Sequence, residues 1–173
     1  MVFARNCRHN FQRDERGAAL IELTVVLPVL LAIGLGVFEF GNLIYNYHLI
    51  SVGVRDAARY AAGLQSGSAD PDAKCIALTG GRSGANCNPA ATPSCTTTCR
   101  VSWWDKASTI TITPTNVSNN DGSGNKLYRG GANITMVTVQ ADVPYRSLGF
   151  LGYFGLGPIT LTTNHEERVF GVR

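Results

Sequence analysis

Cysteine is the residue type whose number and spacing most clearly predict chemistry in this sequence. Of five cysteines, Cys7 lies near the N-terminus and four lie close together in the chain: Cys75, Cys87, Cys95 and Cys99. An even set of cysteines outside the cytoplasm indicates disulfides, and four cysteines allow two bonds in three possible pairings. The alternative is a zinc site, but the spacings are wrong for a zinc knuckle and no histidine lies nearby. The sequence therefore favours disulfides.

The histidines and acidic residues predict no catalytic or metal centre. A histidine–glutamate pair begins at His165, but Val169 occupies the position where an H-E-x-x-H zinc motif needs its second histidine. Residues 121–125 (DGSGN) lack the bidentate glutamate of an EF-hand, so a plain turn is the better interpretation. The sequence also lacks a G-x-S-x-G motif and a basic, aromatic-rich patch. We therefore expect no enzyme, no cofactor, no small-molecule substrate and no nucleic-acid partner.

Glu22 stands at the start of the one apolar run in the sequence that is long enough to cross a bilayer. The run covers residues 18–45, and as a helix rising 1.5 Å per residue it can span a hydrocarbon core of roughly 30 Å. Four arginines against two acidic residues give residues 1–17 a charge of +2, out of +3 for the whole chain. The positive-inside rule therefore predicts a cytoplasmic N-terminus and an exported C-terminal part.

Three devices combine a charged start with an apolar run. A secretory signal peptide needs a small-residue cleavage site directly after the run, and residues 41–45 (GNLIY) do not provide one. An uncleaved membrane anchor is the second device. A prepilin-type leader is cut before the run, and here Gly17 closes the charged segment while Glu22 is the fifth residue after it. The sequence favours this third device, with cleavage between Gly17 and Ala18.

Such cleavage would create a positively charged partner for Glu22. A carboxylate deep in a membrane helix costs about 3 kcal/mol, so it needs a partner. After cleavage, Ala18 carries a free α-amine, and in a helical assembly Glu22 of one subunit could bind the Ala18 amine of its neighbour. A buried polar contact of this kind can fix the axial register, as it does in coiled coils. The alternative is a glutamate that reaches the cytoplasmic membrane surface and has no further role.

Two segments, ERGAALIELTVVLPVLLAIGLGVFEFG and RDAARYAAG, resemble the TadE/TadG-like pseudopilin family, the minor pilins of bacterial tight-adherence (Flp, type IVc) pilus systems. The resemblance covers residues 14–63, including the stretch from Gly17 to Glu22 and the helical Pro28. It also reaches the C-terminal end, where ITMVTVQADVPY and ITLTTNHEERV are similar to the closing strands of the family. It implies processing by a prepilin peptidase of the inner membrane, contact with other pilin and pseudopilin subunits, and a role in pilus assembly, adhesion or secretion. Leu23 stands where the major Flp pilin typically has tyrosine, which favours a minor pseudopilin.

Pro28 cannot donate the helical hydrogen bond to residue 24, so we expect a kink there. The hydroxyl of Thr24 could satisfy backbone groups that the proline frees. The kink is either a bending point used when the helix leaves the bilayer or a proline that the membrane helix tolerates.

We expect an α+β fold in which a long N-terminal pilin-like helix, membrane-spanning in its first half, packs on a small antiparallel sheet. The periodicity of apolar residues continues the helix over residues 46–63, with Gly63 as its C-cap. Arg55 and Arg59 lie off the apolar stripe, either solvated or in contact with a subunit or anionic lipid. The exported, disulfide-containing and β-rich domain then covers residues 64–173.

Within that domain, alternating or aromatic runs predict four strands: 100–104, 108–113, 134–143 and 158–168. The alternation changes face at Met136–Val137, which predicts a bulge. Residues 64–98 and 118–131 are rich in turn-forming residues and predict loops. The apolar, glycine-rich residues 149–157 predict a contact with a membrane surface or another subunit, and the alternative is a loop that packs on the core.

These patterns together predict a minor pilin precursor of a tight-adherence pilus, anchored in the inner membrane with its C-terminal domain in the periplasm. The alternative is an uncleaved single-span anchor that displays a periplasmic binding domain.

Overall fold

The structure is a computed structural model of the 173-residue chain. It describes residues 15–64, 70–82, 84, 86–88, 94–95, 97–106, 109–153, 155 and 157–169. Most of the expected leader, including Cys7, lies outside these residues. The chain divides into two compact units, Met1–Gly41 and Asn42–Arg173.

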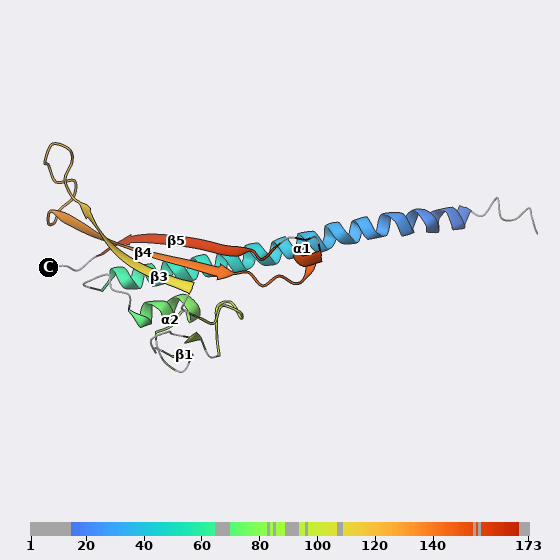
Figure 1. The fold of residues 1–173 in the computed structure, drawn as a ribbon, viewed down its shortest axis with the longest axis horizontal. Coiled ribbons are helices and arrows are strands. Elements are labelled where there is room, and N and C mark those ends of the chain that lie inside the picture. Colours follow the sequence, from blue (N-terminus) through green and yellow to red (C-terminus); the bar gives the residue numbers. More distant parts are fainter. Residues whose placement is uncertain are drawn as a thin grey trace, which may run out of the picture. The chain divides into compact units, whose positions relative to one another are not determined.

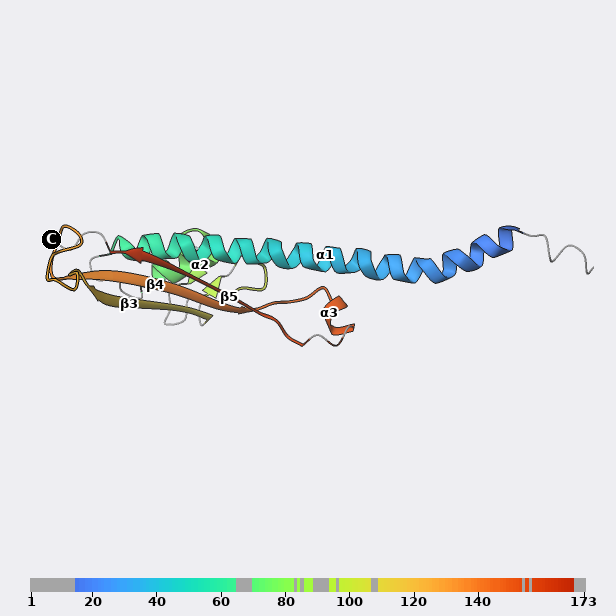
Figure 2. The ribbon, with the colours of Figure 1, turned by 90° about the horizontal axis from the view of Figure 1, so that it is seen from above.

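The first helix, α1, spans Glu15–Ala62 and passes from the first unit into the second (Figure 2). In the first unit, Pro28 lies inside the helix, and α1 bends within its blue N-terminal part (Figure 2). We expected the hydroxyl of Thr24 to serve backbone groups freed by the proline, but it donates to the carbonyl oxygen of Ile21 at 2.7 Å. A threonine in a helix has the carbonyl one turn back as its nearest acceptor, which explains the difference.

In the second unit, α1 packs on an antiparallel sheet of three strands, β3 (Ile110–Ser118), β4 (Asn133–Pro144) and β5 (Thr160–Arg168), in the order β3-β4-β5. The sheet lies along the cyan part of α1 in both views (Figures 1 and 2). A stripe of helix residues at three- and four-residue steps is fully buried: Ile50, Val54, Ala57, Ala58 and Ala61. These residues join a core with alternate residues of β4 from Val137 to Val143. The expected α+β fold is confirmed.

The expected bulge in β4 is wrong. Met136 pairs with Thr115 on one side and with Arg168 on the other, and the register continues without interruption at Val137. The apolar residues change face because β4 extends beyond the part of the sheet that α1 covers. Ile134 and Met136 are half-buried on the face opposite Val137.

Two other strand predictions need correction. Residues 100–104 form bends and turns instead of a strand, and their aromatic character reflects core packing, since Trp104 is 1% exposed. Strand β3 begins near the expected place but runs on through Pro114 to Ser118. It lies at one edge of the sheet, and an edge strand tolerates proline because its outer N–H groups need no partner strand.

Residues 64–98, expected to be loop, contain the helix α2 (Pro71–Thr79). The side chain of Asp70 accepts a hydrogen bond from the amide of Asp72 at 2.8 Å, and Pro71 occupies the first helical turn. Gly80 ends the helix in the left-handed conformation, at φ 84°. A short two-stranded sheet follows, formed by β1 (Cys87–Asn88) and β2 (Ser94–Cys95). A four-residue helix, α3 (Phe150–Tyr153), lies between β4 and β5.

Candidate functional site

The first candidate surface is the exposed apolar part of α1, within which Glu22 is the one charged residue between Ala19 and Phe38. By length and composition, α1 is the one helix among the described residues that is able to cross a membrane, and none of its most apolar stretch is buried. Large apolar side chains are exposed throughout that stretch, for example Leu23 at 53% and Val29 at 58%. Such a surface needs lipid or other helices around it.

Glu22 lies at the beginning of this surface. With Ala19, Leu23 and Val26 it lines a shallow hollow on one face of α1. The carboxylate therefore stands among apolar neighbours on the outside of a single chain, where a group from another chain can reach it.

A second site joins α1 to the disulfide-containing region through the RDAAR motif. The guanidinium of Arg100 donates to the carboxylate of Asp56 at 2.6 Å, and the two side chains are 18% and 37% exposed. The backbone amide of Arg100 also donates to the carbonyl oxygen of Leu78, at 2.8 Å. Through Arg100, Asp56 thus holds the end of α2 and the loop after Cys99 against α1.

Gly53 makes this close approach possible. A Cβ atom at this position would overlap the carbonyl oxygen of Ala77 in α2, and the side chain of Arg100 passes beside it. Unlike Asp56, the two arginines of the motif form no comparably close ion pair in the described contacts. Arg55 is exposed, and Arg59 lies 3.8 Å from Glu167 with 66% of its side chain exposed. The role of Asp56 was not predicted from the sequence, because its partner is 44 residues away.

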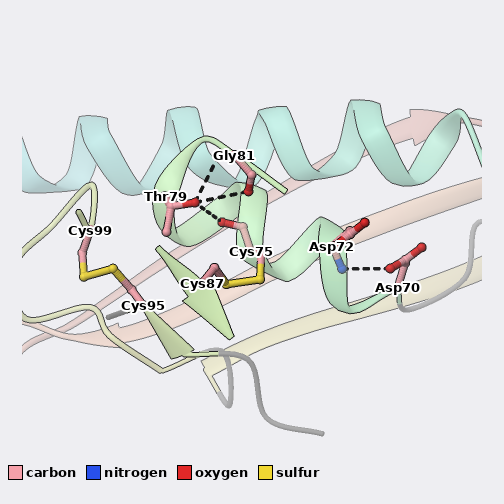
Figure 3. The surroundings of a disulfide bond; sticks show 8 residues. All are labelled: Asp70, Asp72, Cys75, Thr79, Gly81, Cys87, Cys95 and Cys99. Atoms are coloured by element: carbon pink, nitrogen blue, oxygen red, sulfur yellow. Dashed lines mark hydrogen bonds between the residues drawn. A yellow bond between two sulfur atoms is a disulfide. The ribbon is translucent and has the colours of Figure 1, made fainter. Parts of the chain in front are cut away.

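The four cysteines of the domain form two disulfides, Cys75–Cys87 and Cys95–Cys99, which is one of the three pairings left open above (Figure 3). The first links α2 to β1, and the second closes a loop of a few residues that leads directly into Arg100. The part of the chain that the structure describes contains no group of three His, Cys, Asp or Glu side chains that could hold a metal ion.

The turn-rich segment between β3 and β4 is organised by Asn119, which is fully buried. Its amide group donates to the carbonyl oxygens of Tyr128 and Gly131 at 2.8 and 2.9 Å, and its side-chain oxygen accepts from the amide of Tyr128. The backbone amide of Asn125 donates to Asp121, and this bond, with the side-chain bond to Asn125, lowers the pKa of the Asp121 carboxyl. The segment is therefore a fixed turn. We had no sequence signal for Asn119, because its bonds go to backbone atoms.

On β5, the Nε2 atom of His165 lies 3.0 Å from the Oε1 atom of Glu167. The guanidinium of Arg59 lies 3.8 Å from the carboxylate of Glu167. Nothing in these described contacts supplies a nucleophile, so the geometry assigns no reaction to the pair.

Comparison with known protein families gives a match to the first part of the chain. Residues 17–59 match the family model described as TadE-like protein. The match begins at Gly17, the residue before the expected cleavage, and ends at Arg59 of the RDAAR motif. It confirms the resemblance found in the sequence over these residues, where the chain is similar to TadE-like proteins. No curated protein and no solved structure matches the chain.

Proposed function

We propose that this protein is the precursor of a minor pilin of a tight-adherence pilus. The leader stays in the cytoplasm, a prepilin peptidase removes it between Gly17 and Ala18, and the first half of α1 holds the protein in the inner membrane. The domain from residue 64 to the C-terminus is periplasmic. The mature chain then joins other pilin and pseudopilin subunits through the first half of α1.

The observation that carries this proposal is the isolated acid in an exposed apolar helix. A plain anchor has no need of Glu22, since a carboxylate within the membrane costs about 3 kcal/mol at full depth. The family match supports the same interpretation, because it starts at Gly17 and includes Glu22. A new α-amine at Ala18 would supply the positive partner, and the pair would set the register between neighbouring subunits.

The folded domain supports a role in assembly or adhesion. The Asp56–Arg100 ion pair and the common hydrophobic core hold the domain against the second half of α1, and the two disulfides cross-link the domain internally, so a force on the domain passes to the helix. Its described residues carry no catalytic arrangement, and the TadE-like family is not known as a family of enzymes.

The test is the N-terminus of the protein in cells that contain the prepilin peptidase of the same pilus system. Intact mass and N-terminal sequencing should show a chain that begins at Ala18, and cells without the peptidase should keep the full chain. The variant Gly17→Leu should remain uncut, because a large side chain then precedes the scissile bond. Gly34→Leu is the matched control, since Gly34 is exposed and a Cβ there meets no atom within 4 Å. A full-length chain in every case would instead support the uncleaved anchor.

A further inference from the structure

The segment between β4 and β5, residues 145–159, is an apolar surface that the proposed function does not use. We call it the β4–β5 loop; it contains α3 and lies at the end of the sheet opposite the β3–β4 turn (Figures 1 and 2). Tyr145, at the start of the loop, is buried, whereas Leu148 is 56% exposed and Phe150 and Leu151 are half-buried. Arg146 is the only charged residue in the loop, and it is exposed.

A hydrogen bond between α1 and Tyr145 determines which turn of α1 lies beside the start of this loop. The side-chain amide of Asn42 donates to the hydroxyl of Tyr145 at 2.8 Å. Asn46, which is 8% exposed, in turn donates to the backbone and side-chain oxygens of Asn42, at 2.7 and 3.1 Å. The aromatic ring of Trp103 packs edge-on against Tyr145, with ring centroids 5.9 Å apart. The start of the loop is therefore held beside the helical turn that contains Asn42.

That helical turn is where the apolar run ends. Asn42 follows directly on the last residue of the first unit, and the run expected to cross the bilayer ends at Tyr45. Ile44 and Tyr45, two and three residues after Asn42 in the chain, are each 62% exposed. Within the second unit, the β4–β5 loop therefore lies beside the last residues of the apolar run, through the contact between Tyr145 and Asn42.

The loop also lines an open hollow of about 310 Å³. Its wall combines the apolar side chains of Leu151, Pro158 and Ile159 with the polar Arg146 and Ser147. A cation beside an apolar wall suits a phospholipid, whose phosphate carries the negative charge and whose glycerol and first acyl carbons are apolar. Basic residues near an anionic membrane surface are attracted to it.

We propose that the β4–β5 loop rests on the membrane surface and that its hollow holds the headgroup of an anionic phospholipid, with the phosphate at Arg146. The contact orients the domain against the bilayer before the subunit is incorporated into the pilus. It depends on membrane insertion of α1 and does not depend on removal of the leader, so the two proposals can fail separately.

The experiment uses the full chain in liposomes made from lipids that carry bromine on their acyl chains, which quenches nearby tryptophan. Leu148→Trp places a reporter in the loop. Val117→Trp is the matched control, since Val117 is 50% exposed and lies on β3 near the opposite end of the sheet. We expect the added fluorescence of Leu148→Trp to be quenched at least about twofold more, because interfacial segments sit roughly 5–10 Å deep in the headgroup region. Equal, weak quenching of both variants overturns the proposal.

The phosphate contact is tested in the same liposomes with and without phosphatidylglycerol. Adding Arg146→Gln to the Leu148→Trp variant should weaken lipid occupancy by roughly fivefold in anionic liposomes, while Arg146→Lys should preserve most of it. Quenching that Arg146→Gln leaves unchanged overturns the headgroup site. If the emission of the Leu148→Trp variant responds to the ratio of protein to lipid and not to bromine, the loop contacts a second copy of the chain and the proposal is wrong.

Discussion

The two halves of α1 are both rich in apolar residues, but they use them in opposite ways. From Leu20 to Phe40 the helix exposes large side chains, with Val29 at 58% and Phe38 at 74% exposure. From Ile50 to Ala62 it buries a stripe in which alanine predominates. Small side chains allow the sheet to approach the helix backbone, whereas large ones offer the contact area that lipid or neighbouring helices require. Side-chain size, more than apolar content, thus separates the two environments.

A charged substitution at matched valines should separate the halves most strongly. Val54→Asp places a carboxylate in the closed core and should destabilise the domain by about 4 kcal/mol or more. Val29→Asp should leave the unfolding of the domain unchanged and impair membrane insertion instead, at a cost of about 3 kcal/mol. Near-ultraviolet circular dichroism of the full chain in detergent reports the first effect, and carbonate extraction of membranes reports the second. Equal loss of domain stability in both variants would contradict the division of α1.

Removal of the disulfides should affect only the second half and its domain. Replacing Cys75 and Cys87 by alanine should lower the free energy of unfolding by about 3 kcal/mol, because a cross-link between residues 12 apart restricts the unfolded chain. The same change at Cys95 and Cys99, four apart, should cost about 2 kcal/mol. Urea unfolding of the full chain in detergent measures both losses. A larger loss at the shorter loop would show that strain or packing, and not chain restriction, dominates.

Replacing one glycine in each half of α1 by alanine tests the contrast between the buried and the exposed half with a smaller expected effect. Gly53→Ala forces a Cβ against the carbonyl oxygen of Ala77 and should cost about 2 kcal/mol, as overpacking of a core does. Gly36→Ala meets no atom within 4 Å, so the domain should unfold as in the wild type. Thermal unfolding of the two variants decides the comparison. A stable Gly53→Ala variant would mean that α2 can move away from α1.

The smallest expected effect lies far from both halves, at Asp121 in the β3–β4 turn. Its pKa is lowered in the folded protein, so its ionised form favours the folded turn. This contribution is fully present above the unfolded pKa, near 3.8, and is lost as the pH falls through the lower folded value. The amide signals of Ser123 and Asn125 should therefore shift only below about pH 4. Asp121→Asn should abolish that shift, and a titration that moves signals of α1 residues would show coupling that we do not expect.

Local patterns in the sequence were sufficient for the elements that depend on periodicity. The two parts of α1, the core of β4, most of β5 and the presence of disulfides could be predicted in this way. Contacts between distant residues could not. The Asp56–Arg100 pair and the buried Asn119 depend on where the chain folds back, and α2 is too short to show a clear apolar period.

Errors in the strand predictions have a related cause. The aromatic run at Trp103 and Trp104 predicts a strand, but these side chains pack from a turn and the residue after it, and burial alone does not distinguish a strand from a turn. The change of face at Met136 suggested a bulge because the sequence does not show where the helix stops covering the sheet. In both cases the missing information is which neighbour covers each side chain.

The most direct test of the proposed assembly is whether Glu22 touches the amino terminus of another subunit. A membrane-permeant carbodiimide joins a carboxylate to an amine only when the two are in contact, and mass spectrometry with isotopically labelled copies separates links between chains from links within one chain. We predict a link from Glu22 to the α-amine of a neighbouring pilin subunit, and none in the Glu22→Gln variant. A processed chain whose Glu22 forms no link between chains would contradict the proposal.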